Sequence, residues 1–477
     1  MLPGTARDAA TSEAPDVGVA KPYLLRLERL ALKLIRTRFK GAQGLWQFQL
    51  DLLHVQREIQ AAIAETKTRL KGDKSVHGDL QSLRDARMHS RRLGDAFAWA
   101  VLGNDRRLIY PLAQNEQRVS IPTDDHGSRG ALGIAEALSN KGWGFPLLHD
   151  ITDSLRIGDV TFVRPGKPTQ TVEIKTQLVG ERPAAAGKKV NEYRVTVIAP
   201  GEASLEIGRL GEFLPPPVDE RRALRHTPRL RRQLVRLRLA KAYQDAPLDS
   251  LIELDAQNFM STAISPTNPG YWENLRRIVR IARRTGYAAE CIDGAFLYLA
   301  LYSSEGIDAE SVRSCPMIQD LMDSNVLFKH GEGPNSLNIF TIPTTQNAPQ
   351  LFMPYFLYSL PRTAIADLLH GRMMIFCLVN PGRIIVALEE AGFRVARPLR
   401  GNYLMDGSLT IHADFKVDGT QCVAEFQNLN YHVPETIYEF RGLQYLVDIA
   451  SAMRETAKAA YRSHRERERD QAKAPAS

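Results

Sequence analysis

The sequence predicts a mixed α/β protein with an N-terminal helical region followed by two α/β regions. Hydrophobic residues make up 44% of the 477 residues and charged residues 24%, as in ordinary globular proteins. Apolar residues recur at helical spacing near the N-terminus and alternate at strand spacing further along. At roughly 150 residues per domain, a chain of this length is expected to form two to four domains.

Composition divides the chain into successive segments. In order, we expect a disordered Ala/Pro-rich leader (1–20), a helical domain (21–105), an α/β core (106–212), a Pro-rich linker with an Arg-rich helix (213–249), a second α/β domain (250–461) and a charged tail (462–477). No stretch of about 18 apolar residues could span a membrane, and the leader lacks the apolar core of a secretory signal. The four cysteines show no CxxC spacing, which leaves a zinc ribbon or disulfide framework unsupported and favours a cytoplasmic location.

The helical domain is expected to contain three helices. Amphipathic stretches cover 24–35 and 50–59, with Gly41 and Gly44 between them as helix breakers, and a third helix covers 80–102. Their simplest arrangement is a helical hairpin or small bundle that packs against, or positions, another part of the chain.

The first α/β core is expected to be one helix followed by short strands. The helix is predicted over 128–141, and the strands over 145–150, 157–163, 171–177 and 193–198. Pro165, Gly166 and Pro168 mark a turn between the second and third strands, which predicts a hairpin.

The two faces of this hairpin differ because side chains alternate across a strand. One face is apolar and expected to be buried, and it carries Val160, Phe162, Val172 and Ile174. The opposite face is polar and expected to be exposed, and it carries Asp159, Glu173, Lys175 and Gln177. With the turn centred near Gly166, Asp159 lies almost directly across from Glu173. A solvated edge hairpin would show the same alternation, so a plain surface hairpin is the alternative interpretation.

The neighbouring carboxylates indicate a divalent-metal site. Asp159 and Glu173 would raise each other's pKa unless a cation lay between them. Mg²⁺, or Mn²⁺ in its place, suits such a pair, because Mg²⁺ binds one or two carboxylates together with water and phosphate oxygens. Lys175 can orient the attacking water and stabilise charge on the phosphate. The hairpin therefore predicts metal-assisted phosphodiester hydrolysis.

This hairpin resembles the signature of the PD-(D/E)XK nuclease superfamily, which has the restriction-endonuclease-like fold. The residues that carry the resemblance are Asp159 and the triplet Glu173-Ile174-Lys175, within the segment 125–200. Gly158 stands where the signature has a proline, and the segment after the triplet is short and interrupted. The resemblance implies a core of one helix and three strands, continued by a second helix and a further strand.

The resemblance also implies roles for individual residues. Asp159 and Glu173 would bind Mg²⁺, and Lys175 would be the catalytic lysine. Glu136, on the preceding helix, matches the acidic residue that many members place there, and would be a supporting acid and metal ligand.

A similar order of elements recurs over 380–461. A helix over 380–392 precedes a hairpin with an Asp418-Gly419 turn, a strong hairpin signal, and a long helix over 435–461 follows. A two-residue loop there predicts three opposed pairs: Val417 with Thr420, His412 with Glu425, and Asp414 with Val423. The polar face of this hairpin then carries Asp414, Glu425 and Gln427.

This second module resembles a degenerate PD-(D/E)XK core with glutamine in place of lysine. A rival register uses Asp414-Phe415-Lys416 as the signature, preceded by Asp406. An inactive or purely structural α/β domain is favoured over a second working site.

The excess of basic residues is concentrated in 219–241, within a chain of net charge +8. A helix is expected to start at Thr227-Pro228 and to carry Arg229, Arg232 and Arg236 on one face. Arginines in a first turn oppose the helix dipole, so we expect an anionic partner, nucleic-acid backbone phosphates. A solvated or acid-paired face is the alternative. In a second Arg-rich helix, over 271–286, the arginines gather at the C-terminal end, and a structural role is favoured.

Together these patterns predict a Mg²⁺-dependent nuclease, with DNA favoured over RNA and an endonuclease favoured over other types. Bacterial restriction or anti-phage defence would suit such an enzyme, which could act with partner subunits or as a homo-oligomer. The alternative is a non-catalytic nucleic-acid-binding or scaffolding protein built on an inactive nuclease-like core. His126 and His149 lie near aspartates, but no hydrolase or metalloprotease motif accompanies them, so His149 is expected to be a core or loop histidine.

Overall fold

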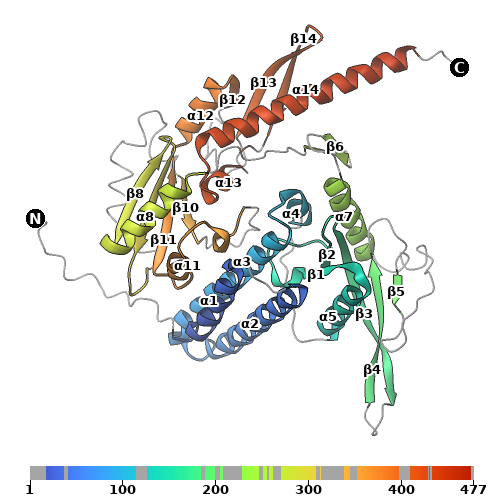
Figure 1. The fold of residues 1–477 in the computed structure, drawn as a ribbon, viewed down its shortest axis with the longest axis vertical. Coiled ribbons are helices and arrows are strands. Elements are labelled where there is room, and N and C mark those ends of the chain that lie inside the picture. Colours follow the sequence, from blue (N-terminus) through green and yellow to red (C-terminus); the bar gives the residue numbers. More distant parts are fainter. Residues whose placement is uncertain are drawn as a thin grey trace, which may run out of the picture.

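The computed structural model describes most of the chain between residues 18 and 473 (Figure 1). The described residues are 18–36, 41–113, 126–183, 189–198, 205–207, 228–245, 251–254, 257–260, 270–307, 312, 338–343, 352–396, 409–427, 429 and 432–473. The predicted mixture of helices and small sheets is confirmed, and the sheets are antiparallel.

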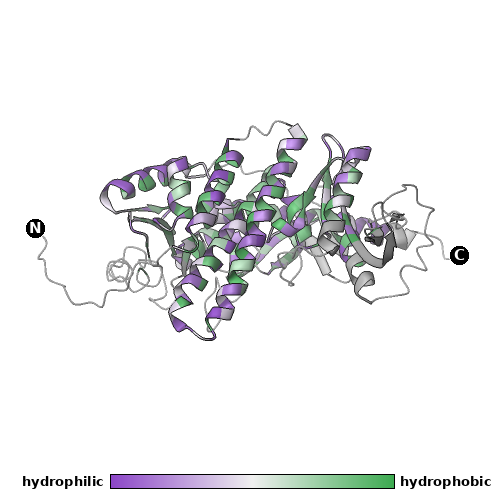
Figure 2. Ribbon diagram, turned by 90° about the horizontal axis from the view of Figure 1, so that it is seen from below, coloured by the Kyte–Doolittle hydropathy of each residue, from purple (hydrophilic) through white to green (hydrophobic). Residues whose placement is uncertain are grey.

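The N-terminal region is helical, as predicted. Its elements are α1 (Lys21–Ile35), α2 (Gly41–Arg69), the short helix η1 (Lys74–Val76), α3 (His77–Val101) and α4 (Arg106–Ala113). The first three long helices pack against one another through buried leucines such as Leu27, Leu52 and Leu83. Hydrophilic and hydrophobic residues alternate along the helices in Figure 2, as expected for amphipathic helices that bury one stripe.

The first sheet has five strands in the order β1-β2-β3-β4-β5. Its elements and their flanking helices are α5 (His126–Leu138), η2 (Ser139–Trp143), β1 (Phe145–Leu148), η3 (His149–Ile151), β2 (Val160–Val163), β3 (Gln170–Pro183), β4 (Lys189–Ile198), β5 (Leu205–Ile207) and α7 (Pro228–Asp245). Helix α5 and strands β1 to β4 overlap the predicted segments, β3 extends beyond its predicted end at 177, and β5 was not predicted. Every neighbouring pair is antiparallel.

The sheet departs from the implied nuclease order after β3. Strand β3 continues to Pro183 and pairs directly with β4, so only residues 184–188 separate the two strands. A second helix before β4 is therefore absent from the described chain, and an antiparallel hairpin takes its place. The sequence signal for that helix was weak for this reason, because the residues after Lys175 belong to a long strand.

The described part of the second α/β region contains three further sheets. The largest has the strand order β10-β11-β9-β8, the next the order β12-β13-β14, and the smallest pairs β6 with β7. The elements are β6 (Leu251–Leu254), β7 (Gln257–Met260), α8 (Trp272–Thr285), β8 (Tyr287–Ile292), β9 (Phe296–Tyr302), β10 (Asn338–Ile342), η6 (Tyr355–Leu357), α11 (Arg362–Leu369), β11 (Met373–Val379), α12 (Pro381–Glu390), β12 (Phe393–Ala396), β13 (Thr410–Val417), β14 (Thr420–Phe426), α13 (His432–Tyr438) and α14 (Leu443–Lys473).

The C-terminal helices differ from the prediction of one helix over 435–461 followed by a solvated tail. The chain breaks after α13, where Phe440 has a φ of 53°, and α14 then runs on through Lys473. The Asp293 carboxylate accepts the Leu443 N–H at 2.7 Å and so caps the start of α14. Side-chain pairs such as His464 and Glu468, one turn apart with Nε2 and Oε1 3.3 Å from each other, lie along the helix in the expected tail.

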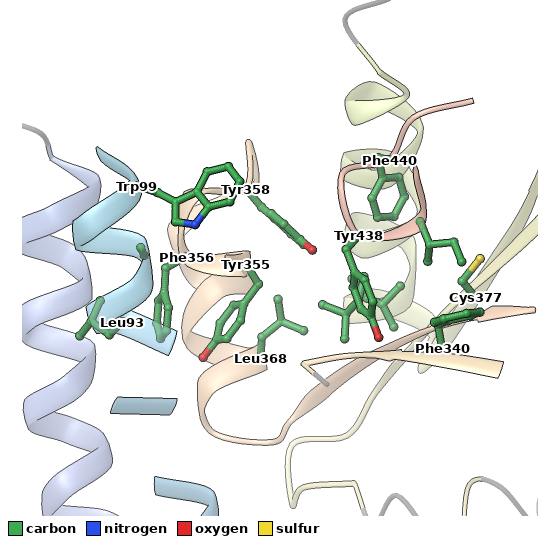
Figure 3. Packing of buried hydrophobic residues seen from close by; sticks show 14 of the residues in the cluster. Leu93, Trp99, Phe340, Tyr355, Phe356, Tyr358, Leu368, Cys377, Tyr438 and Phe440 are labelled. Atoms are coloured by element: carbon green, nitrogen blue, oxygen red, sulfur yellow. The ribbon is translucent and has the colours of Figure 1, made fainter. Parts of the chain in front are cut away.

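The large sheet and the N-terminal helices share one hydrophobic core (Figure 3). Aromatic residues around η6, including Tyr355 and Phe356, lie between α3 and the sheet. On the α3 side they meet Leu93 and Trp99. None of the helices that the structure describes is long and apolar enough to cross a membrane.

Two contacts hold the first sheet against the helices. The Gln49 side chain of α2 bonds the edge of β1 like an extra strand residue, donating to the Pro146 carbonyl and accepting from the Leu148 N–H, both at 2.8 Å. At the other end, the Leu112 carbonyl of α4 accepts the N–H groups of Arg156 and Ile157 at 2.7 and 3.0 Å. The segment leading into β2 is thus fixed by helices on both sides.

Candidate active site

The apolar face of the β2–β3 hairpin is buried, as predicted. Val160, Phe162, Val172 and Ile174 are at most 6% exposed. They form one cluster with Ile134, Ala135 and Leu138 of α5. Helix α5 therefore covers this face of the sheet.

The described part of the polar face is largely buried as well, so the prediction that this face is exposed is wrong for Glu173. Asp159 is half-buried, and the side chains of Lys175 and Gln177 lie outside the described part. Thr161 is 1% exposed, Thr171 5% and Glu173 3%. Strands β2 and β3 lie inside the five-stranded sheet, and Leu237 of α7 packs beside this face near Gly158 and Thr171. The alternative of a solvated edge hairpin is therefore also wrong. Strand alternation could not reveal this, because the covering helix comes from a distant part of the sequence.

A β-bulge sets the position of Asp159. The register pairs Val160 with Val172, yet the Asp159 N–H also donates to the Val172 carbonyl, at 2.8 Å. Asp159, just before β2, and Val160, its first residue, thus oppose one residue of β3. Gly158, which precedes Asp159, has a φ of +79°.

The backbone at the bulge explains why residue 158 is a glycine. A Cβ atom at Gly158 would lie 2.9 Å from the Val172 carbonyl oxygen and 2.7 Å from Thr171 Cγ2. Proline is restricted to a φ near about −65°, so it could not adopt this backbone conformation. Glycine is required here both by the backbone and by the space.

The bulge places the Asp159 carboxylate against β3, directly beside Glu173. Asp159 Oδ2 accepts the Ile174 N–H at 2.6 Å, so this oxygen continues the hydrogen-bond ladder beyond the end of β2. Asp159 is half-buried and Glu173 is buried. The Asp159 carboxylate thus reaches the β3 backbone next to Glu173, through a side chain-to-backbone bond that the sequence pattern did not predict. The approach of the two carboxylate groups to one another stays a prediction.

The other residues of the predicted site are placed differently. Glu136 is exposed on α5, the helix that covers the apolar face, whereas Glu173 belongs to the opposite face. Lys175 follows Glu173 by two residues on β3 and pairs with Thr196 of β4, but its side chain lies outside the described part of the structure. Across the residues that are described, no three His, Cys, Asp or Glu side chains gather closely enough to hold a metal ion. The structure does not bring Glu136 to the carboxylate pair.

His149 lies next to this pair, and sequence reasoning assigned it no role there. Its ring contacts the Gly158 carbonyl and the Thr161 hydroxyl, and it is 1% exposed. The nearby aspartates are engaged elsewhere, since Asp153 accepts from Arg91 of α3 at 3.0 Å. No local motif could have revealed this contact, because it depends on how η3 folds back against the bulge.

The carboxylate pair has suitable donors for a hard divalent cation. Asp159 and Glu173 offer oxygen atoms of the type Mg²⁺ and Mn²⁺ prefer, and a Mg²⁺ site with one or two protein carboxylates is ordinary. Glu136 would not belong to that set. The burial of Glu173 restricts access to the pair from solvent.

The second hairpin has the predicted register, including Val417 opposite Thr420, His412 opposite Glu425 and Asp414 opposite Val423. Its polar face is exposed. Both oxygens of Asp414 accept from Arg394, at 2.9 and 3.0 Å, and Gln427 donates to Glu425 at 2.8 Å. Asp406 of the rival register lies outside the described residues.

The two arginine-rich helices also differ. On α7, Leu237 and Ala240 are buried and Arg236 is half-buried, while the side chains of Arg229 and Arg232 lie outside the described part. On α8, several arginines bond protein groups, which confirms a structural role for them. Arg276 donates to the Ser359 carbonyl, Arg277 to Glu290 and Arg283 to Thr363.

Comparison with known proteins adds no relative: no family model, no curated protein and no solved structure matches this chain. The described residues define a mixed helix-and-sheet protein with antiparallel sheets, in which the Asp159 carboxylate binds the β3 backbone beside the buried Glu173.

Proposed function

We propose that this protein is a metal-dependent nuclease that hydrolyses phosphodiester bonds, with DNA as the favoured substrate. The observation that carries the proposal is the bulge at Gly158, which sets the Asp159 carboxylate on the Ile174 N–H beside Glu173. Acidic residues on a hairpin are common, but a bulge that fixes one carboxylate on the backbone next to a second, buried acid is a specific arrangement. Bulges are enriched next to active sites because they redirect side chains.

Each residue then has a defined part. Asp159 and Glu173 would hold Mg²⁺ or Mn²⁺, and the bound ion would supply charge stabilisation at the phosphate and a more acidic water. The Ile174 N–H fixes one oxygen of Asp159, which leaves the orientation of the carboxylate defined before substrate arrives. Lys175 would orient the attacking water and stabilise charge on the phosphate. Arg229, Arg232 and Arg236 on α7 would contact backbone phosphates.

The proposal is tested by DNA cleavage with isosteric variants of the full chain. Asp159→Asn keeps an oxygen for the Ile174 N–H but removes the charge, and Glu173→Gln does the same at its position. Both should abolish Mg²⁺-dependent cleavage while the protein stays folded, and EDTA should abolish cleavage by the unmodified chain. Undiminished Mg²⁺-dependent cleavage by Asp159→Asn would refute the assignment.

Matched controls come from acids outside the pair. Glu136→Gln should leave cleavage intact, because this exposed residue of α5 does not join the pair. Glu425→Gln, on the second hairpin, should also leave it intact, if the module over 380–461 is inactive. Loss of all cleavage in folded Glu425→Gln would instead assign a working site to the second hairpin.

A second candidate is a nucleic-acid-binding or scaffolding protein that does not cut. The observation favouring it is the 3% exposure of Glu173, which leaves little room for a hydrated cation and a phosphate. This candidate predicts DNA binding that EDTA does not change and no cleavage product with Mg²⁺ or Mn²⁺.

A further inference from the structure

His149 holds the bulge from the side of β1. It begins η3, directly after β1, and its main-chain N–H donates to the Asp159 carbonyl at 3.0 Å. Its ring Nδ1 lies 3.1 Å from the Gly158 carbonyl oxygen. One residue therefore bonds the carbonyl groups of Gly158, which precedes the bulge, and of Asp159, which is its first residue.

The hydrogen bonds of the ring define its tautomer. A carbonyl oxygen can only accept, so Nδ1 carries the proton and donates to Gly158. Nε2 must then accept, and it lies 2.7 Å from the Thr161 hydroxyl. The Thr161 oxygen lies 2.8 Å from the Thr171 hydroxyl, which can donate to it in turn. The chain of bonds thus runs from Thr171 through Thr161 and His149 to Gly158.

The ring is held in this state by its surroundings. His149 is 1% exposed, and burial lowers its pKa to about 4. A neutral ring with both nitrogens engaged is not available as a metal ligand in this arrangement. It is instead suited to fixing the groups around it, as residues behind a metal ligand commonly do.

We propose that His149 is a positioning residue for Asp159. By holding the Gly158 and Asp159 carbonyls, it keeps the bulge in the shape that directs the Asp159 carboxylate onto the Ile174 N–H beside Glu173. This inference rests on the proposed function, because it assigns a task to His149 only if Asp159 binds a metal ion. It requires no proton transfer by the ring.

The test compares two amide variants of the full chain, each of which keeps a polar group at the position of only one of the two ring nitrogens. In His149→Asn the side-chain NH₂ occupies the place of Nδ1 and can still donate to Gly158. In His149→Gln the amide reaches toward the Nε2 position and loses the bond to Gly158. Thr171→Val is the matched control, because it removes only the far end of the hydrogen-bond chain.

The readout is the affinity for Mn²⁺ alone, measured by titration calorimetry without DNA, on samples whose folding is checked by thermal melting. His149→Gln should weaken Mn²⁺ binding by about 10- to 100-fold, the usual effect of losing a residue that orients a metal ligand. His149→Asn and Thr171→Val should bind Mn²⁺ nearly as the unmodified chain does.

The outcomes separate this inference from the proposed function. Unchanged Mn²⁺ affinity in His149→Gln, with clear binding by the unmodified chain, overturns the positioning role alone. Equal losses in His149→Asn and His149→Gln, accompanied by equal falls in melting temperature, also overturn it, because His149 would then serve stability only. No Mn²⁺ binding by the unmodified chain, or binding that Asp159→Asn leaves unchanged, overturns the proposed function and the positioning role with it.

Discussion

The two acidic hairpins of this protein look alike in sequence and differ in structure. Each carries an acid on both strands and alternates polar with apolar residues. On β2–β3 the apolar face and Glu173 of the polar face are buried, and half-buried Asp159 reaches the backbone beside Glu173. On β13–β14 the polar face is exposed and Asp414 forms a two-bond ion pair with Arg394.

Two causes produce this difference: helices distant in sequence bury Glu173, and the bulge sets the direction of Asp159. Strands β13 and β14 pair without interruption from Ile411 to Val417, so Asp414 stays opposite Val423. Just before β2, Asp159 and Val160 both oppose Val172, and the positive φ of Gly158 leads the chain into that bulge. The glycine before Asp159 is therefore the feature of the sequence that distinguishes the first hairpin from the second.

The largest expected effect comes from two glycines with nearly equal backbone angles, Gly158 at +79° and Gly419 at +80°. Gly419→Ala should lower the free energy of unfolding by about 1–2 kcal/mol, because only backbone strain is added in open space. Gly158→Ala should cause similar backbone strain and, in addition, a clash between the new Cβ atom and the Val172 carbonyl. The clash should lower the free energy of unfolding by a further ~1–3 kcal/mol, the usual cost of overpacking. Urea unfolding of both variants checks this. Equal losses would show that the bulge can relax and does not depend on glycine.

Acidification should lower the folding stability of the protein, because His149 beside the β2–β3 hairpin is buried in its neutral form. The folded-state pKa of His149 is lowered by burial to about 4, below its ordinary value of about 6.5. The unfolded chain therefore binds the proton more readily between these values, and the stability due to neutral His149 is lost as pH falls from about 6.5 to about 4. The free energy of unfolding, measured at several pH values across this window, should fall by up to about 3 kcal/mol because of His149.

His149→Gln provides the check on that pH dependence. The variant should show a flatter fall in stability over the same window, and some fall should remain, because burial also lowers the pKa of His89, to about 3. A pH dependence identical to that of the unmodified chain would contradict the assignment of a buried neutral His149.

A smaller difference in stability is expected between alanine variants of Asp159 and Asp414. Asp159→Ala leaves the Ile174 N–H without its acceptor, which should lower the free energy of unfolding by about 1–3 kcal/mol. Asp414→Ala breaks an exposed ion pair with Arg394 and should lower it by less than about 1 kcal/mol. Denaturant melts of both variants compare them. If Asp414→Ala lowers the free energy of unfolding as much as Asp159→Ala does, the greater burial of the first hairpin does not make its aspartate more important for stability.

Much of this architecture could be predicted from local pattern. The turn chemistry at Asp418-Gly419 fixed the register of the second hairpin, and alternation identified the apolar face of the first. The burial of Glu173 could not be predicted, because it depends on helices distant in sequence. Gly158 did carry a signal, since a glycine inside a strand pattern often marks a bulge.

The last and smallest expected effect concerns nucleic-acid affinity. If Arg229, Arg232 and Arg236 contact backbone phosphates, replacing all three with glutamine should weaken DNA binding across unrelated sequences. The slope of log affinity against log salt should fall by up to about 2.7, near 0.9 for each lost phosphate contact on duplex DNA.

The matched control for these arginines lies on the second hairpin. Arg394 is already engaged by both oxygens of Asp414, so Arg394→Gln should leave the salt slope unchanged. Binding measured over a salt series with both variants makes the comparison. An unchanged slope in the α7 triple variant would mean that these arginines form only a solvated helix face. A reduced slope in Arg394→Gln would move the phosphate contacts to the exposed face of β12–β14.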